Sequence, residues 1–130
     1  LEIKGEFADF IEERGTGIDK TITAIEVFQL PAPDFQVTPS HTKVSLFAPR
    51  PLSNMDKGDR VRACYQHACL KWLANDQMSN ETLRQRLNIG KSNYPLASKI
   101  IKETTEAGLI KLADTGSNSP RDRRYIPFWA

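Results

Sequence analysis

The sequence has no uninterrupted apolar run close to the ~20 residues that a membrane-spanning helix needs, so we expect no spanning helix. Its start is mixed and acidic, and we expect no secretory signal peptide there. A Walker-type Gly-x-x-x-x-Gly-Lys-Ser/Thr motif is missing, and so is any set of nucleophile, base and orienting residue. The absence of this motif and of a catalytic set predicts that the chain is not an enzyme.

Cysteine is scarce, with only Cys64 and Cys69, which lie five positions apart on one predicted helix. This spacing places the two thiols on different helix faces, so we expect no disulfide between them and a reducing, cytoplasmic location. His67 lies between them, but helical geometry cannot bring all three side chains to one metal ion. We therefore predict no metal site.

Neither sign of charge dominates, because the net charge of +2 conceals two halves of opposite sign. Residues 1–51 contain 5 Lys and Arg against 8 Asp and Glu, whereas residues 52–130 contain 13 against 8. The second half therefore carries a net charge of +5. This asymmetry favours a polyanionic partner for the second half. Because no apolar run is long enough to span a bilayer, we expect no membrane partner.

The first half has the pattern of two helices followed by a hairpin. Helices are predicted over residues 1–13 and from Thr16 or Gly17 to Phe28, and strands near 35–38 and 44–47. The glycine pair between the helices either approaches a phosphate or forms a plain loop, and its spacing alone favours the loop. The chain begins at Leu1 with a helical pattern already under way, so we expect a piece of a longer protein.

Residues 52–130, after a proline-rich linker, have the pattern of three helices and a hairpin. The first predicted helix runs from about 56 to 75, and Ser79 is a good cap for a short second one. A third helix is predicted over 93–107, and two apolar runs then flank the turn-rich segment 114–124. We expect one apolar core that contains Trp72, Leu73, Leu83, Leu87, Leu96, Ile100 and Leu109.

Two helices joined by a tight turn and followed by a basic hairpin are the order of a winged helix-turn-helix. The predicted fold class is therefore α+β: a winged helix-turn-helix preceded by a small helix-helix-hairpin segment.

Segments along most of the chain resemble one family. The segments are RGTGIDK at 14–20, LPAPDF at 30–35, DRVRACYQHACL at 59–70, AGLIK at 107–111 and RYIPFWA at 124–130. They are similar to the C-terminal part of bacterial transcriptional regulators that carry a divergent GHKL-type ATPase module. Such proteins are often labelled ATP-dependent DNA helicase RecG-related; an AlbA/Schlafen-like domain comes first and a winged helix last.

The resemblance implies that residues 1–51 are the C-terminal remnant of the ATPase-like module and that 52–130 are the winged helix-turn-helix. It also implies a cofactor-binding role for Gly15, Thr16 and Gly17. The asparagine-bearing helix that GHKL proteins use for Mg-nucleotide is not in this chain, so we expect no cofactor in the fragment.

The leading hypothesis is that the second half is the double-stranded-DNA-binding region of a transcriptional regulator, with helix 93–107 as recognition helix and 114–124 as basic wing. The alternative is a protein-interaction or homodimerisation module of a nucleotide-dependent regulator, without direct DNA contact. The upstream domains of the parent protein would be further partners. The predicted DNA-binding residues are Lys91, Ser92, Asn93, Ser98, Lys99, Lys102, Arg121, Arg123 and Arg124.

Overall fold

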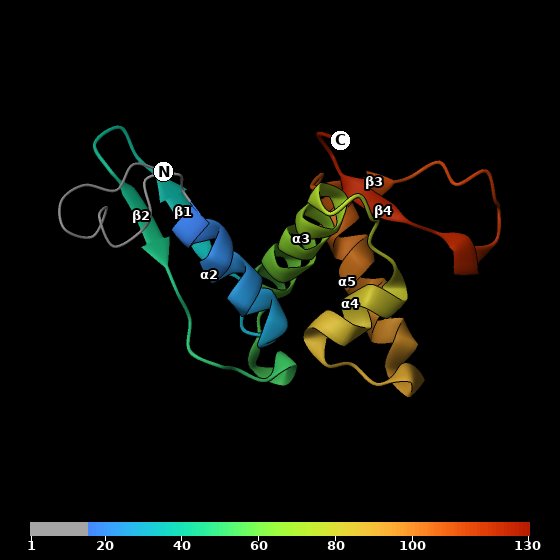
Figure 1. The fold of residues 1–130 in the computed structure, drawn as a ribbon. Coiled ribbons are helices and arrows are strands. Elements are labelled where there is room, and N and C mark those ends of the chain that lie inside the picture. The colour runs from blue at the N-terminus through green and yellow to red at the C-terminus, as the bar shows by residue number, and fades with distance from the viewer. Residues whose placement is uncertain (1–15) are drawn as a thin grey trace. The chain divides into compact units, whose positions relative to one another are not determined.

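The computed structural model of the protein describes residues 16–130, and the chain divides into two compact units, Leu1–Arg50 and Pro51–Ala130. The division lies one residue before the boundary expected from the sequence. Helices and two small two-stranded sheets occur together, so the fold is α+β (Figure 1). The helix predicted over residues 1–13 lies outside the described residues.

The first unit contains one described helix and one hairpin. Helix α2 spans Thr16–Val27, and the Leu30–Pro33 segment that follows cannot continue it, because proline has no backbone N–H. Strand β1 (Asp34–Val37) pairs antiparallel with β2 (Thr42–Ser45). The strand pair was expected one or two residues further along the chain. Its turn is closed by the Thr38 hydroxyl, which accepts a hydrogen bond from the His41 backbone N–H at 3.1 Å.

The second unit begins with three helices whose first turns are capped by neighbouring side chains or by proline. Helix α3 spans Lys57–Leu73 and starts at a reciprocal capping box between Asp56 and Asp59. Helix α4 spans Asn80–Leu87, and the predicted cap Ser79 forms a capping box with Thr82. Helix α5 spans Tyr94–Glu106, with Pro95 in its first turn.

The ends of α4 and α5 depend on left-handed backbone conformations. Asn88 closes α4 at φ 55°, and a single 3₁₀ turn over Lys91–Asn93 then leads into α5. Gly108 follows α5 at φ 75°, a conformation that a residue without a Cβ adopts at little cost. The break near Gly90 and the end at Gly108 were both predicted, although Asn93 makes no capping hydrogen bond.

A short antiparallel ribbon completes the second unit. Strand β3 (Ile110–Leu112) pairs with β4 (Tyr125–Pro127), and the loop 113–124 leads out from one strand and back to the other (Figure 1). Met78, just before α4, also pairs with Tyr125 through two backbone hydrogen bonds of 2.8 and 3.2 Å. This bridge ties the turn between α3 and α4 to the ribbon. β4 is shorter than predicted, because Phe128 and Trp129 lie in a turn beyond it.

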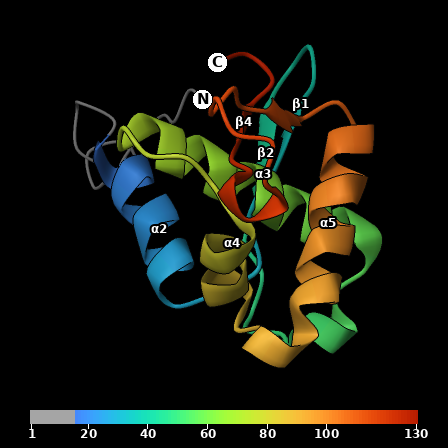
Figure 2. The ribbon, with the colours of Figure 1, turned by 90° about the vertical axis from the view of Figure 1, so that its right-hand side faces the viewer.

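The buried apolar residues of the described chain lie almost entirely in the second unit, where α3, α4, α5 and the ribbon meet (Figure 2). The Cys64 thiol touches the Met78 sulfur at 3.9 Å in the middle of this core, and neither Cys64 nor Cys69 forms a disulfide. The core residues of the second unit are Met55, Val61, Ala63, Cys64, Ala68, Met78, Leu83, Leu87, Ala97, Ile100, Ile101, Ile110 and Ala113.

The core prediction was wrong at Leu73, which is 70 % exposed. Leu73 is five residues beyond the buried Ala68, and at 3.6 residues per turn this places it about 140° away around the helix. Conversely, the polar His67 is buried, because it lies three residues after Cys64 and borders the apolar stripe. Three further predicted core residues are only partly buried: Trp72, Leu96 and Leu109.

Within residues 16–130, no helix is both long enough and apolar enough to cross a membrane. Over the same residues, no three His, Cys, Asp or Glu side chains come close enough to hold a metal ion.

Candidate functional site

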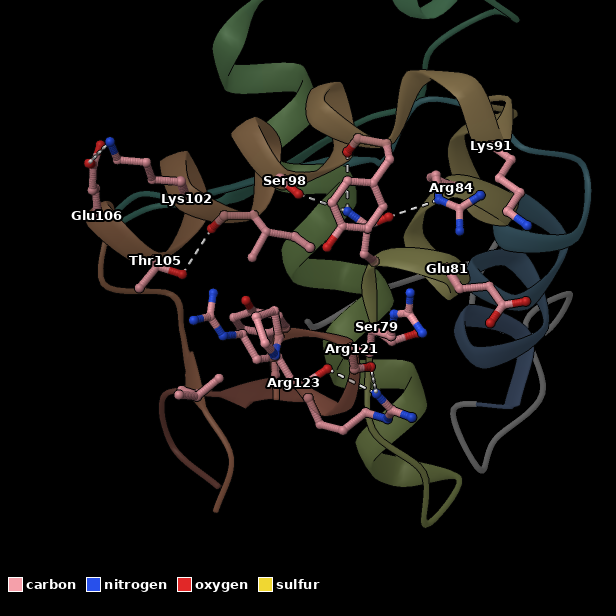
Figure 3. Close-up of a pocket in the computed structure, with 17 residues that line it drawn as sticks. Ser79, Glu81, Arg84, Lys91, Ser98, Lys102, Thr105, Glu106, Arg121 and Arg123 are labelled. Atoms are coloured by element: carbon pink, nitrogen blue, oxygen red, sulfur yellow. Dashed lines mark hydrogen bonds and ion pairs between the residues drawn. The ribbon is translucent and has the colours of Figure 1, made fainter. Parts of the chain in front are cut away.

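A broad open groove of about 1110 Å³ lies in the second unit, between helices α4 and α5 on one side and the segment 112–125 on the other. Figure 3 shows Arg84 and Lys91 at one end, Lys102 and Glu106 at the other, and Arg121 and Arg123 across from Ser98. We call this feature the α5–loop groove. It is lined by Ser79, Asn80, Glu81, Arg84, Lys91, Tyr94, Ser98, Ile101, Lys102, Thr105, Glu106, Leu112, Pro120, Arg121, Arg123, Arg124 and Tyr125.

The α5–loop groove is lined by more cationic than acidic side chains. Six lining side chains are cationic and two, Glu81 and Glu106, are acidic. The cations come from α4, from the turn before α5, from α5 itself and from the loop, so the groove is basic on both sides. A concave surface of one sign concentrates field lines and attracts ligands of the opposite sign.

Helix α5 buries Ala97, Ile100 and Thr104 against the core, and its mostly polar neighbouring face, with Ser98 and Lys102, lines the groove. Lys102 is largely exposed, and its ammonium lies 3.9 Å from Glu106, a weak surface ion pair. The carboxylate of Glu103 lies 3.8 Å from Arg60 of α3 and does not line the groove. Of the α5 carboxylates, only Glu106 therefore opposes an anionic ligand in the groove.

The loop 113–124 is ordered by side-chain hydrogen bonds within it. The Asp114 carboxylate accepts from the Gly116 N–H at 3.0 Å, and the Ser117 hydroxyl donates to Asp122 at 2.7 Å. Gly116 adopts φ 70°, so a residue with a Cβ there would be strained. These contacts fold the loop back on itself and support the turn at Pro120–Asp122 that carries Arg121.

Arg124 differs from the other loop arginines in what its guanidinium contacts. Its Nη1 donates to the carbonyl oxygen of Arg123 at 3.0 Å and to that of Arg121 at 3.3 Å. It also lies near Asp76, whose carboxyl pKa is lowered chiefly by the Gln77 backbone N–H and further by Lys71 and Arg124. Arg124 thus supports the loop through hydrogen bonds to its backbone.

The structure brings six of the predicted DNA-binding residues to one place: Lys91, Ser98, Lys102, Arg121, Arg123 and Arg124 line the α5–loop groove. The other three, Ser92, Asn93 and Lys99, are exposed but do not line it. Ser92 and Asn93 belong to the 3₁₀ turn before α5, and Lys99 lies on the outer face of the helix.

The groove residues that sequence reasoning missed include Asn80, Arg84 and Tyr94. The side-chain amide of Asn80 donates to the Ser98 hydroxyl at 3.0 Å and to the Tyr94 carbonyl at 3.3 Å. Its carbonyl oxygen accepts from Arg84 Nε at 2.8 Å. The four-residue spacing of Asn80 and Arg84 on a helix was the available signal, whereas the contacts to α5 bridge 14 and 18 residues of sequence.

The suggested cofactor residues lie in the other unit. Gly15 is outside the described residues, Thr16 begins α2, and Gly17 accepts a hydrogen bond on its carbonyl from the Thr21 hydroxyl at 2.8 Å. This bond is an ordinary contact within the first turns of a helix.

Comparisons with protein-family models, with curated proteins and with solved structures give no match to this chain.

Proposed function

We propose that residues 51–130 form a winged helix-turn-helix that binds double-stranded DNA, as the DNA-binding part of a transcriptional regulator. The order α3, α4, α5, β3, loop and β4 supports this fold, with α4 and α5 as the helix-turn-helix pair and 113–124 as the wing. The bridge from Met78 to Tyr125 adds the start of a third strand to the ribbon, next to the helix pair.

The observation that carries the proposal is the clustering of six cationic side chains around the α5–loop groove, against two carboxylates. The cations belong to segments that are up to 40 positions apart in sequence, so the fold, and not a local charge run, assembles them. Neutralising phosphates with such groups provides most of the sequence-independent affinity of a protein for DNA.

The shape of the groove favours a polymer over a small molecule. Typical small-molecule pockets have volumes of roughly 300–1,000 Å³ and bury most of their ligand. The α5–loop groove, at about 1110 Å³, is larger and is open to solvent. A helix in the major groove and a loop at the neighbouring minor groove must straddle the phosphodiester strand between them. In this proposal, that phosphodiester strand lies in the basic α5–loop groove.

This placement separates the roles of the predicted residues. Lys91, Lys102, Arg121 and Arg123 would contact phosphates, because all four line the groove. Ser92, Asn93 and Lys99 are exposed on or just before α5 and outside the groove, so they are the side chains placed to reach base edges.

The proposal is tested by measuring duplex DNA binding as a function of salt. Arg121→Gln/Arg123→Gln removes two groove cations and should lower the slope of log K against log salt by about 0.9 for each phosphate that is no longer neutralised. The matched control is Lys43→Gln/Lys57→Gln, which removes the same charge from exposed positions outside the groove. We expect the control to keep the slope of the unsubstituted protein.

Two results would contradict the proposal. One is a chain without measurable affinity for duplex DNA even at low salt. The other is an equal reduction of slope in the groove variant and in the control, because that would mean that only net charge matters.

A second candidate function, self-association, is favoured by a separate feature. Leu73, Phe128 and Trp129 are large apolar residues at 70, 53 and 48 % exposure. The Phe128 ring stacks on Tyr65 at 6.3 Å between centroids, and the Trp129 indole N–H donates to the Tyr65 hydroxyl at 3.0 Å. Exposed aromatic surface of this kind is typical of protein contacts. None of these residues lines the α5–loop groove, so a second copy bound here would leave the groove open.

A further inference from the structure

Helix α4 contributes one cation, Arg84, to the α5–loop groove. Arg84 is half-buried, and Figure 3 shows its guanidinium at the same end of the groove as Lys91. A long side chain at such a place normally loses considerable rotamer entropy when it binds a ligand. The protein already holds Arg84 through a side-chain hydrogen bond.

The residue that holds Arg84 is Asn80, one turn earlier on α4. Its Oδ1 accepts a hydrogen bond from Arg84 Nε at 2.8 Å, while its Nδ2 donates to the Ser98 hydroxyl at 3.0 Å and to the Tyr94 carbonyl at 3.3 Å. The amide orientation is determined by this network: turning it over would face the NH₂ group to the guanidinium and the oxygen to a carbonyl. One planar group therefore connects Arg84 to the first turns of α5.

The atom used on Arg84 matters for its function. Nε is the inner nitrogen of the guanidinium, so its bond to Asn80 leaves the edge formed by the two terminal nitrogens for a ligand. Two parallel N–H groups on such an edge match two oxygens of one phosphate. The geometry points to a phosphate contact that is positioned before the ligand arrives.

We propose that Arg84 is a DNA-contacting residue of the α5–loop groove and that Asn80 is its positioning residue. The inference rests on the proposed function and adds α4 to the DNA-contacting elements. It also gives Ser98 a structural role, because this hydroxyl accepts from Asn80 and joins α4 to α5.

The simpler explanation is a helix-surface contact without function. Polar pairs four residues apart stabilise an isolated helix slightly whether or not any ligand binds. A pair of this kind affects stability alone, whereas a positioning pair also affects affinity, and the two substitutions then act non-additively.

The experiment is a double-mutant cycle with Asn80→Ala, Arg84→Met and both together, measured as binding to a duplex of about 16 base pairs over a range of salt. Arg84→Met should weaken binding roughly tenfold, in the range for a hydrogen bond to a charged group. It should also lower the salt slope by about 0.9. Asn80→Ala should weaken binding less, and its effect should shrink when Arg84 is already Met. Lys57→Met is the matched control, an exposed cation outside the groove that should change neither quantity.

A second readout needs no DNA. The Arg84 Nε–H should exchange with solvent more slowly than those of Arg121 and Arg123 in ¹H–¹⁵N spectra, and Asn80→Ala should remove this protection. Thermal melting verifies that every variant is folded.

The outcomes separate the two proposals. If the unsubstituted chain binds no duplex, the proposed function fails, and with it the contact role of Arg84. If that chain binds but Arg84→Met has the same affinity and slope, the further inference alone is wrong. Strict additivity in the cycle, or an unprotected Nε–H, overturns the positioning role of Asn80.

Discussion

Residues of one type have different roles in this molecule because their surroundings differ. Arg121, Arg123 and Arg124 all line the α5–loop groove, but Arg124 also donates to the carbonyl oxygens of the other two. Arg86, on α4, is buried, whereas Arg84, two residues earlier, reaches the groove. Charge alone therefore does not describe these arginines, because the fold engages different atoms of each.

The two cysteines provide a residue-scale prediction about pH. Burial raises the pKa of the Cys69 thiol, and hydrogen bonds with Tyr65 and Trp129 offset this only in part. A raised pKa leaves less thiolate at any given pH, so Cys69 should be alkylated by iodoacetamide more slowly than a free thiol such as glutathione at pH 7–8. The pH at which Cys69 is alkylated at half its maximal rate should also be higher than that for glutathione. Cys64, fully buried, should not react until the protein unfolds.

Mass spectrometry of the tryptic peptide 63–71, with fragmentation to separate the two thiols, measures both rates. A half-maximal rate for Cys69 at or below the pH found for glutathione would show that its environment favours the thiolate, contrary to this account.

At the scale of elements, local chemistry predicted most helices and strands of residues 16–130. Caps at Ser79 and Gly108 and the regular apolar spacing of α5 act over a few residues, so they can be recognised without the fold. Helix rotation was harder to predict: Leu73 and His67 lie near the edges of the α3 apolar stripe, where one position decides burial. The bridge between Met78 and Tyr125 joins residues 47 positions apart and has no sequence signature.

The same distinction holds for the candidate site. Basic residues on the helix and loop that a winged helix would use were recognisable from charge, and six of the nine predicted residues line one groove. The Asn80 network was not recognisable from the sequence, because its partners on α5 are set by how α4 and α5 pack. The winged helix-turn-helix and its DNA partner stay proposals.

A paired substitution tests the orientation of the helices. Ile100 is completely buried on α5, so Ile100→Ala should lower the free energy of unfolding by about 2–5 kcal/mol, because it removes buried methyl groups and leaves a cavity. Leu73→Ala removes a side chain of the same size from an exposed position and should change it by less than about 0.5 kcal/mol. Urea denaturation measures both. Equal effects, or a larger one for Leu73, would mean that α3 or α5 is rotated from the orientation described.

At the scale of the whole molecule, the two units differ in net charge as well as in structure. The half from residue 52 onward has a net charge of +5, and six of its 13 Lys and Arg residues line the α5–loop groove. The first unit contributes a net negative charge and few of the buried apolar residues. A polyanion would therefore be attracted to one unit and, within it, to one concave surface.

The most direct test of this account is a titration of the ¹⁵N-labelled chain with a short DNA duplex, followed by ¹H–¹⁵N spectra. We predict that the largest shift changes occur at the start of α4, along the outer face of α5 and in the loop 113–124. The amides of Leu73, Phe128 and Trp129 should change little. Shift changes confined to those three residues and their neighbours, or spread evenly over both units, would contradict the assignment of the α5–loop groove as the DNA-binding surface.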